Sequence, residues 1–265
     1  MECSVPNNSA RKMAIAEAFS KAAHGYDQHA QFQRDVGNEL LKYLPQNLSG
    51  LKVLDIGCGT GYFSELLSNR GAEVTAADLS KEMLVQAKAR CNNNVLEYRL
   101  ADAEALPFNN HHFDIVFSSL ALQWCDDLSI PLRELQRVTK KGGKVLFSTL
   151  MQGSLIELRN AWAEIDSYQH VNQFLSEKQI KIALAQAGSQ NHHLDLLTIQ
   201  LWYASAFKLM RDLKGIGATH VGARSPGLTK KSTLSRVETE YQRFKNDNEL
   251  LPATYQVCLG TIFYD

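Results

Sequence analysis

Three closely spaced glycines and an aspartate are the first residues in the sequence whose types and spacing could do chemistry. They lie in "VLDIGCGTGYFS" (53–64), where Asp55 is followed by Gly57, Gly59 and Gly61. The segment opens with the apolar run of a buried strand, so the glycines come where the chain turns out of the sheet. Because glycine has no β-carbon, such a turn lets the backbone approach a ligand closely. The pattern predicts a ligand site at the carboxyl end of this first strand.

Two further aspartates follow the next two predicted strands. Asp78 ends the strand in "EVTAADL", and Asp102 follows "VLEYRL" in "LADAEALPF". Ligands of open α/β sheets bind at the carboxyl ends of the strands, so these acids are expected beside the glycine turn. A carboxylate accepts two donors at once, which suits Asp78 to a pair of ribose hydroxyls. Each aspartate alone could equally be a turn or helix-capping residue, but their recurrence after three successive strands favours a binding site.

The spacing of the glycines separates this turn from the dinucleotide fingerprint. In G-x-G-x-x-G the third glycine comes one residue later than Gly61 does here. The turn instead resembles that of class I S-adenosylmethionine (SAM) methyltransferases, which implies SAM as the cofactor. The resemblance places Asp78 at the ribose and Asp102 at the adenine amino group, and it packs Leu79 and Met83 on the adenine. The predicted cofactor contacts are Gln33, Asp55, Gly57, Cys58, Gly59, Gly61, Asp78, Leu79, Met83, Asp102, Ala103 and Leu120.

The segment "SSLALQWCDDL" (118–128) bears on the methyl acceptor. Enzymes that methylate nucleic-acid amino groups typically have an asparagine or aspartate, two prolines and an aromatic residue here, and this chain does not. The segment also has no obvious general base, which phenol methylation would call for. A carboxylate, with a usual pKa of about 4, is already ionised near neutral pH and needs only alignment, a desolvated pocket and a cation to hold it. The segment therefore favours a carboxylate acceptor.

A wider resemblance makes the acceptor more specific. "FSTLMQGSLIELRNAWAEID", "HVNQFLSEKQI", "LKGIGATH" and "ALQWCDDLSIPLRELQRV" closely resemble the malonyl-acyl-carrier-protein O-methyltransferases of biotin synthesis, as does the N-terminal "AFSKAAHGYDQHAQFQ". The resemblance extends from about residue 12 to residue 264, although "HVGARSPGL" departs from the pattern. It implies methylation of the free carboxylate of malonyl-acyl carrier protein (ACP), or of malonyl-CoA, to a methyl ester that starts pimeloyl synthesis for biotin.

Seven residues are candidates for positioning the substrate, and none of them is a general base: Tyr26, Gln123, Trp124, Asn172, Phe174, Lys214 and Arg224. Tyr26 is expected over the SAM methionine or at the acid, and Gln123 and Trp124 at the methyl-transfer region. Asn172 and Phe174 are expected along the thioester path, and the two cations at malonate or phosphopantetheine. Simpler roles also remain open. The aromatic residues could pack in the core, and the two cations and Gln33 could be exposed surface residues.

Strands alternating with helices predict an α/β fold, a doubly wound, mostly parallel, Rossmann-like sheet of seven strands with a helical insertion after strand five. We expect an N-terminal helical cap (1–50), a SAM-binding core (51–150), a helical insertion or lid over the carboxyl edge of the sheet (151–190) and a return to the sheet with a basic helical segment (191–265). Capping boxes are predicted at Ser154 with Glu157 and at Ser176 with Gln179, and Ser80 is predicted as an N-cap.

Composition narrows the partners and the setting. Lys plus Arg equals Asp plus Glu at 28 each, which gives no overall attraction for nucleic acid. The five cysteines include no CxxC pair, so neither a zinc site nor any other metal site is expected, and a reducing cytoplasm fits. Because there is no apolar run of about 18 residues, we expect no membrane span. The chain is expected to act as a cytoplasmic monomer.

Positive charge gathers in one segment of this neutral chain. Residues 208–245 hold nine basic and three acidic side chains. Carrier proteins are acidic, so the segment could steer a malonyl-ACP toward the enzyme, although a solvated helical face explains it as well. Two other functions also remain open. One is methylation of a small quinone- or polyketide-type molecule, and the other is SAM binding without catalysis.

Overall fold

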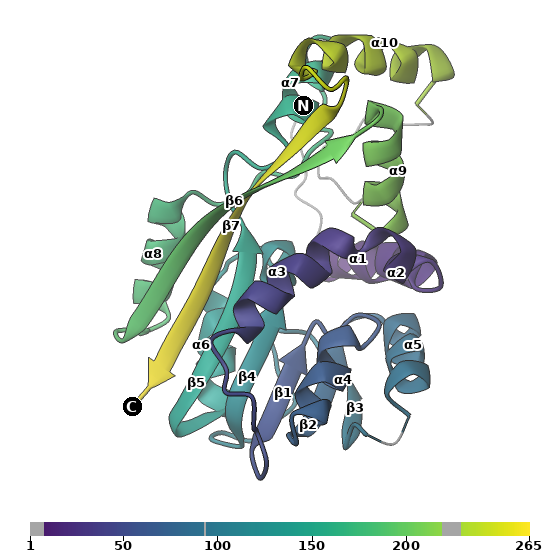
Figure 1. The fold of residues 1–265 in the computed structure, drawn as a ribbon. Helices are drawn as coiled ribbons and strands as arrows, with labels where there is room; N and C mark the ends of the chain where they lie inside the picture. Colours follow the sequence, from purple (N-terminus) through teal and green to yellow (C-terminus); the bar gives the residue numbers. More distant parts are fainter. Residues whose placement is uncertain (1–7, 93, 219–228) are drawn as a thin grey trace.

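A seven-stranded sheet forms the centre of the molecule (Figure 1). The computed structural model describes residues 8–92, 94–218 and 229–265. The strands are β1 (Lys52–Ile56), β2 (Glu73–Asp78), β3 (Glu97–Leu100), β4 (Phe113–Ser119), β5 (Thr139–Leu150), β6 (His192–Tyr203) and β7 (Leu251–Tyr264). Their order is β3-β2-β1-β4-β5-β7-β6, in which β7 is antiparallel to its two neighbours and the other pairs are parallel. The prediction of a doubly wound, mostly parallel sheet is confirmed.

Helices precede, connect and cover the strands (Figure 1). In the first half of the chain they are α1 (Asn8–Ala22), α2 (Tyr26–His29), α3 (Gln31–Leu41), α4 (Tyr62–Asn69), α5 (Lys81–Cys91) and α6 (Ser129–Val138), with the 3-10 helix η1 (Leu122–Trp124). In the second half they are α7 (Ile156–Ala163), α8 (Glu177–Gln186), α9 (Ala206–Gly215) and α10 (Lys231–Tyr241), with the 3-10 helix η2 (Gln242–Phe244). In the part of the chain that the structure describes, no helix combines the length and apolar character needed to cross a membrane.

The sheet separates two hydrophobic clusters because successive strand residues point to opposite faces. Val53 of β1 packs in a cluster with Val36 of α3. Its neighbour Leu54 packs on the other face, with Leu132 of α6 and Ile180 of α8. The apolar run in β1 therefore reads as continuous because both faces of the strand are covered.

Helix α8 belongs to this second helical layer, which differs from the expectation that all of 151–190 covers the carboxyl edge. Ile180 and Leu184 are completely buried beside strands β5 and β7, and α8 packs against α6. Helix α7 packs instead against α10 and β7. The buried apolar face of α8 explains the difference, because a strand face offers it more apolar surface to cover than the edge of the sheet does.

One of the two predicted capping boxes is wrong. The residue that precedes α7 is Leu155, in a left-handed conformation with φ of 54°, and it provides no side-chain cap. The Ser154 hydroxyl donates to the carbonyl of Gln256 and accepts from its N–H, at 3.1 and 2.9 Å. Glu157 accepts from the backbone N–H of Thr254 at 3.2 Å. Both residues of the predicted box therefore bind strand β7, which the spacing alone could not reveal.

The other predicted caps are confirmed. Before α8, the Ser176 hydroxyl and the Gln179 side chain form the reciprocal pair of a capping box. Before α5, the Ser80 hydroxyl accepts from the Met83 N–H at 3.2 Å. These caps satisfy backbone donors of the first helical turn.

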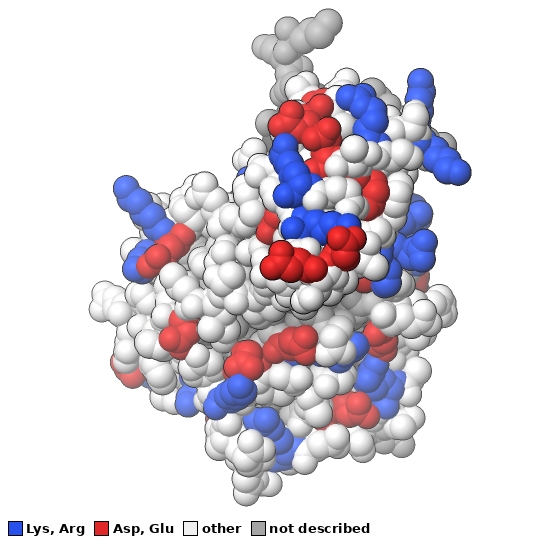
Figure 2. Space-filling view, turned by 45° about the horizontal axis from the view of Figure 1, so that its top comes forward, with Lys and Arg blue, Asp and Glu red and all other residues white. Residues whose placement is uncertain are grey.

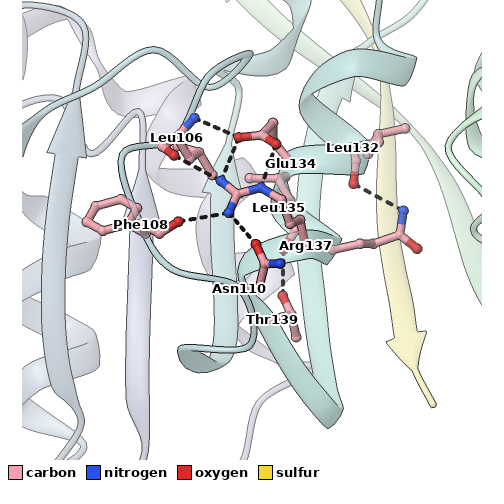
Figure 3. Close-up of polar contacts among 9 residues, drawn as sticks. Leu106, Phe108, Asn110, Leu132, Glu134, Leu135, Arg137 and Thr139 are labelled. Carbon is pink, nitrogen blue, oxygen red and sulfur yellow. Dashed lines mark hydrogen bonds and ion pairs between the residues drawn. The ribbon is translucent and has the colours of Figure 1, made fainter.

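A network around Arg137 fixes the loop that follows Asp102 (Figure 3). The guanidinium donates to the carbonyls of Leu106 and Phe108 at 2.9 and 2.8 Å. It also pairs with Glu134, one turn back on α6, at 2.7 Å. Glu134 in turn accepts from the Leu106 N–H at 2.8 Å, and hydrogen bonding to Arg137 lowers the pKa of its carboxyl. The loop that leaves the predicted adenine site is thus tied to α6.

Candidate functional site: two joined cavities

The first cavity lies at the carboxyl ends of β1, β2 and β4. It contains about 770 Å³ of space, part of it open to solvent. Eight of the twelve predicted cofactor residues line it: Gly57, Gly59, Asp78, Leu79, Met83, Asp102, Ala103 and Leu120. The structure thus brings together residues that the sequence places after four different strands.

The three glycines of the turn have different environments. All three have positive φ, at 72°, 55° and 83° for Gly57, Gly59 and Gly61. A β-carbon on Gly61 would lie 2.9 Å from Ala87, whereas one on Gly59 would meet no atom within 4 Å. Gly61 therefore permits close packing of α4 on α5, and Gly59 leaves its space free on the cavity side.

Asp78 connects the glycine turn to the start of α5. Its Oδ2 accepts from the Gly59 N–H at 2.9 Å, and its Oδ1 accepts from the Ser80 N–H at 2.8 Å. The side chain is buried, and this burial raises the pKa of its carboxyl against the opposing effect of these hydrogen bonds. Each carboxylate oxygen has a second lone-pair site, so Asp78 can still accept from ligand hydroxyls while it holds the turn.

Asp55, Cys58 and Gly61 do not line the cavity. Asp55 lies behind the turn, 2% exposed, and accepts from the Ser64 hydroxyl at 2.6 Å. Burial raises the pKa of Asp55 to about 7, and the charge of Asp78 adds to this rise. Cys58 is also buried. These residues support the turn from behind, and a contact between them and a ligand remains a prediction.

Helix α1, within the segment expected as an N-terminal helical cap, lines the first cavity with residues that the sequence analysis did not single out. Its residues Lys12, Ile15 and Phe19 contribute to the lining. The Lys12 ammonium forms ion pairs with both Asp102 and Glu104, in the loop after β3. The predicted adenine acceptor is thus paired with an amine from a helix ninety residues earlier in the chain. No local pattern signals a contact over such a distance.

Two further contacts hold α1 across the cavity. Arg11 pairs with Asp126, beyond η1. At the other end of the helix, the hydroxyls of Ser20 and Ser80 are 2.9 Å apart. These contacts and those of Lys12 fasten α1 to three of the segments that surround the cavity.

The second cavity is lined mainly by apolar side chains. Four predicted residues line this cavity and not the first: Gln33, Gln123, Asn172 and Phe174. Gln33 was predicted at the cofactor, but it lines this cavity and not the first. Residues that the sequence analysis missed also line the cavity, from α3, α7, the segment between α7 and α8, the end of α9 and β7: Phe32, Leu158, His170, Leu213, Ile216 and Tyr255.

Four residues line both cavities and mark where the two meet: Phe19, Tyr26, Leu120 and Trp124. The rings of Phe19 and Trp124 pack edge to face, with centroids 5.3 Å apart. Leu120 has a φ of 51°, a left-handed conformation that is costly for leucine. Burial raises the pKa of the Tyr26 phenol, as does the nearby charge of Asp78, so its hydroxyl stays protonated. Sequence reasoning had placed Tyr26 and Trp124 near the acceptor, and the structure puts both at this junction.

One of the two predicted cations, Lys214, is not in the described lining of either cavity. Lys214 is exposed on α9, although Leu213 beside it lines the second cavity. Arg224 lies outside the described residues. Within 8–92, 94–218 and 229–265, no cluster of three or more His, Cys, Asp or Glu side chains could hold a metal ion. The geometry therefore offers one site whose lining includes acidic side chains and the glycine turn, joined to a second site that no Asp, Glu, Lys or Arg of the described residues lines.

Comparisons with known proteins indicate the family of the chain. Residues 54–147 match the family described as a methyltransferase domain. The chain is 43% identical over 258 residues to the malonyl-[acyl-carrier protein] O-methyltransferase of Serratia marcescens, covering 97% of this chain and 98% of that protein. It is 39% identical over 247 residues to the biotin biosynthesis bifunctional protein BioHC of Cellvibrio japonicus, covering 93% of this chain and 49% of that protein.

A solved structure shows the same fold at lower sequence identity. It is phosphoethanolamine N-methyltransferase 2 of Haemonchus contortus, in complex with phosphomonomethylethanolamine and S-adenosylhomocysteine. The TM-score is 0.54 at 19% identity, with 87% of this chain and 52% of that chain covered.

Proposed function

The chain belongs to the malonyl-[acyl-carrier protein] O-methyltransferases, and from this premise we propose that it methylates the free carboxylate of a malonyl thioester with SAM. The observation that carries the proposal is the junction of the two cavities. A cofactor in the first cavity and an acyl group in the second would meet beside Tyr26, Leu120 and Trp124. Reactive groups held in contact need no bimolecular encounter, which is a large part of what such an enzyme supplies.

The first cavity fits SAM by the chemistry of its lining. Asp78 offers a buried carboxylate to the ribose hydroxyls, and the open space at Gly59 admits a ligand against the backbone. Leu79 and Met83 provide apolar surface for the adenine. When bound, SAM supplies an electrophilic methyl group. Lys12 pairs with both Asp102 and Glu104, which ties α1 to the loop after β3 on that side of the cavity.

The junction residues suit an acceptor that needs no deprotonation. None of Phe19, Tyr26, Leu120 and Trp124 is a base near neutral pH, since the Tyr26 phenol has a raised pKa. A malonyl carboxylate is already ionised. The apolar walls around it remove water, which makes the carboxylate a better nucleophile and limits side reactions.

Two amides in the second cavity suit the thioester arm of a carrier. Gln123 donates from Nε2 to the Leu120 carbonyl at 2.6 Å, which directs its Oε1 elsewhere. The Oε1 atoms of Gln123 and Gln33 are buried and have no hydrogen-bond partner among the described residues. The phosphopantetheine arm has amide N–H donors that could satisfy such acceptors.

Basic side chains lie next to this cavity, on the elements that also line it. Helix α9 contributes Leu213 and Ile216 to the wall and exposes Arg211 and Lys214. Neither of these two cations forms an ion pair within the described part of the chain. Figure 2 shows basic side chains at one side of the upper part of the molecule, where Figure 1 has α9 and the start of α10, and mixed charges over its middle. We infer that this side of α9 meets the acidic carrier protein.

The product links the activity to biotin. A methyl ester removes the negative charge from the malonyl end, so fatty-acid enzymes can elongate the chain as if that end were apolar. The name of the Cellvibrio japonicus relative refers to biotin biosynthesis, and the chain spans about half of that bifunctional protein.

Mass spectrometry of malonyl-ACP and of malonyl-CoA, after incubation with SAM and the protein, tests the proposal. We expect one added methyl on the malonyl group, with faster turnover on the ACP. Acetyl-ACP, which lacks the free carboxylate, should stay unchanged and serves as the control. If neither malonyl thioester is methylated by protein that binds SAM, the proposed function is wrong and the acceptor is another molecule.

A further inference from the structure

His170 is the imidazole in the wall of the second cavity, and neither the motifs nor the junction accounts for it. With Val171 it lines both this cavity and an outer groove on the far side. Its side chain is 10% exposed, so it is an almost buried polar group. Burial of a polar group in an apolar wall costs free energy unless the group is hydrogen-bonded. The partners of His170 therefore indicate what its ring can bind.

Two neighbours fix the orientation of this ring. Its Nε2 lies 2.8 Å from Oδ1 of Asp166. Its face stacks on the indole of Trp162, with centroids 3.5 Å apart and an angle of 9° between the planes. Trp162 is itself 6% exposed, so the stack is anchored in the core. The ring is therefore held in one position.

These contacts determine what the other nitrogen can do. A carboxylate only accepts hydrogen bonds, so Nε2 carries the proton that points to Asp166. Nδ1 has no hydrogen-bond partner among the described residues, and it can donate only when the imidazole is positively charged. A carboxylate lies at one edge of the ring and an indole face lies beneath it, and both groups attract positive charge.

We propose that His170, oriented by Asp166 and Trp162, is the cation that binds the free carboxylate of the malonyl group through Nδ1. The inference rests on the proposed function, because it assigns one subsite of the same reaction. The carboxylate would gain a charge-assisted hydrogen bond in an apolar cavity, where such bonds are strong. Its reacting oxygen would stay free for methyl transfer.

The other charged and titratable groups near His170 are paired with it, line the outer groove or are neutral. Asp166 faces its Nε2, and Arg159 and Tyr168 line the outer groove. Tyr26 and Tyr255 are the other titratable side chains on the described wall of the second cavity. Burial raises the pKa of both phenols, so they are neutral. Arg159 donates to the Asn172 carbonyl at 3.0 Å, which holds the segment that carries His170.

The test compares His170→Gln with His193→Gln in steady-state methylation of malonyl-ACP. Glutamine keeps a donor for Asp166 but cannot place a positive charge at the position of Nδ1. His193 is a matched control, since it also pairs with an aspartate, Asp195 at 3.0 Å, but is 61% exposed on β6. For His170→Gln we expect KM for malonyl-ACP to rise about tenfold or more, the scale of one charge-assisted hydrogen bond, with SAM affinity unchanged.

The pH profile provides a readout that a structural role would not change. Between about pH 5 and pH 8 the wild-type KM for malonyl-ACP should rise, because imidazoles ordinarily lose their proton in this range. The KM of His170→Gln should be high throughout. Asp166→Asn, which removes the charge beside Nε2 but keeps a carbonyl acceptor for it, should raise KM for malonyl-ACP above the wild-type value. This second variant still tests the inference if His170→Gln does not fold.

Acetyl-ACP identifies the group that His170 binds. It has the carrier and the thioester but no free carboxylate, so its inhibition constant should be the same for wild type and His170→Gln. If His170→Gln loses affinity equally for acetyl-ACP and malonyl-ACP, the inference is overturned. A wild-type KM for malonyl-ACP that does not change with pH would also overturn it. A wild-type protein that methylates no malonyl thioester would instead overturn the proposed function.

Discussion

The two cavities differ in how far apart in the chain their walls originate. Apart from α1 and Tyr26, the described wall of the first cavity comes from residues 56–125, mostly from the segments that leave four parallel strands. The described wall of the second cavity comes from residues 19–33, 120–124, 150–174 and 213–218 and from Tyr255. Short motifs can specify the first kind of site, because successive parallel strands bring their carboxyl ends together. The second kind depends on the packing of distant elements.

The largest expected effect is a loss of SAM binding, caused by a substitution in the first cavity. In Asp78→Asn, an amide N–H₂ would face the N–H of Gly59 or of Ser80, because both oxygens of Asp78 accept backbone hydrogen bonds. We expect SAM affinity to fall about a hundredfold or more, which corresponds to the free energy of two lost hydrogen bonds to a charged carboxylate. Calorimetric titration with SAM measures this. Asp195→Asn, at an exposed position on β6, is the control, and unchanged SAM binding in Asp78→Asn would show that this carboxylate is not at the ligand.

A smaller effect is expected from a substitution at the junction of the two cavities. Trp124 lines both cavities, so Trp124→Ala removes the surface that aligns the two reactants. We expect kcat for malonyl-ACP to fall about ten- to a hundredfold, because loss of alignment acts on the reacting geometry. SAM affinity should change much less. Steady-state kinetics checks the split, with Trp202→Ala, at a position 44% exposed on β6, as the control. A loss confined to SAM binding would assign Trp124 to the cofactor side only.

The smallest effect concerns the approach of the carrier to the substrate cavity. Replacing Arg211 and Lys214 with glutamine should raise KM for malonyl-ACP by about two- to fourfold at low salt, with no change for malonyl-CoA. The difference should shrink as salt screens the charges. Lys178→Gln is the control, at an exposed position on α8, which Figure 1 shows on the other side of the molecule from α9. An equal rise in KM for malonyl-CoA would mean that these cations bind the shared phosphopantetheine arm.

Sequence patterns predicted local features well where the partner of a residue lies within a few positions. The seven-stranded sheet and the caps at Ser80 and Ser176 are confirmed. The capping box at Ser154 is wrong because its hydroxyl binds Gln256, about a hundred residues away. The same limit explains why Lys12 was missed, since its partners Asp102 and Glu104 come from a different part of the chain.

The sequence by itself determined the class of fold, the glycine turn and the row of aspartates, because strand periodicity and missing β-carbons act over a few residues. Only the tertiary structure decided that α1 covers the cofactor cavity and that Gln33 lines the other one. It also decided that His170 is held between Asp166 and Trp162 in the substrate wall. Ion pairs, stacking and burial depend on which surfaces meet, and these surfaces meet only when helices and strands from distant parts of the chain pack together.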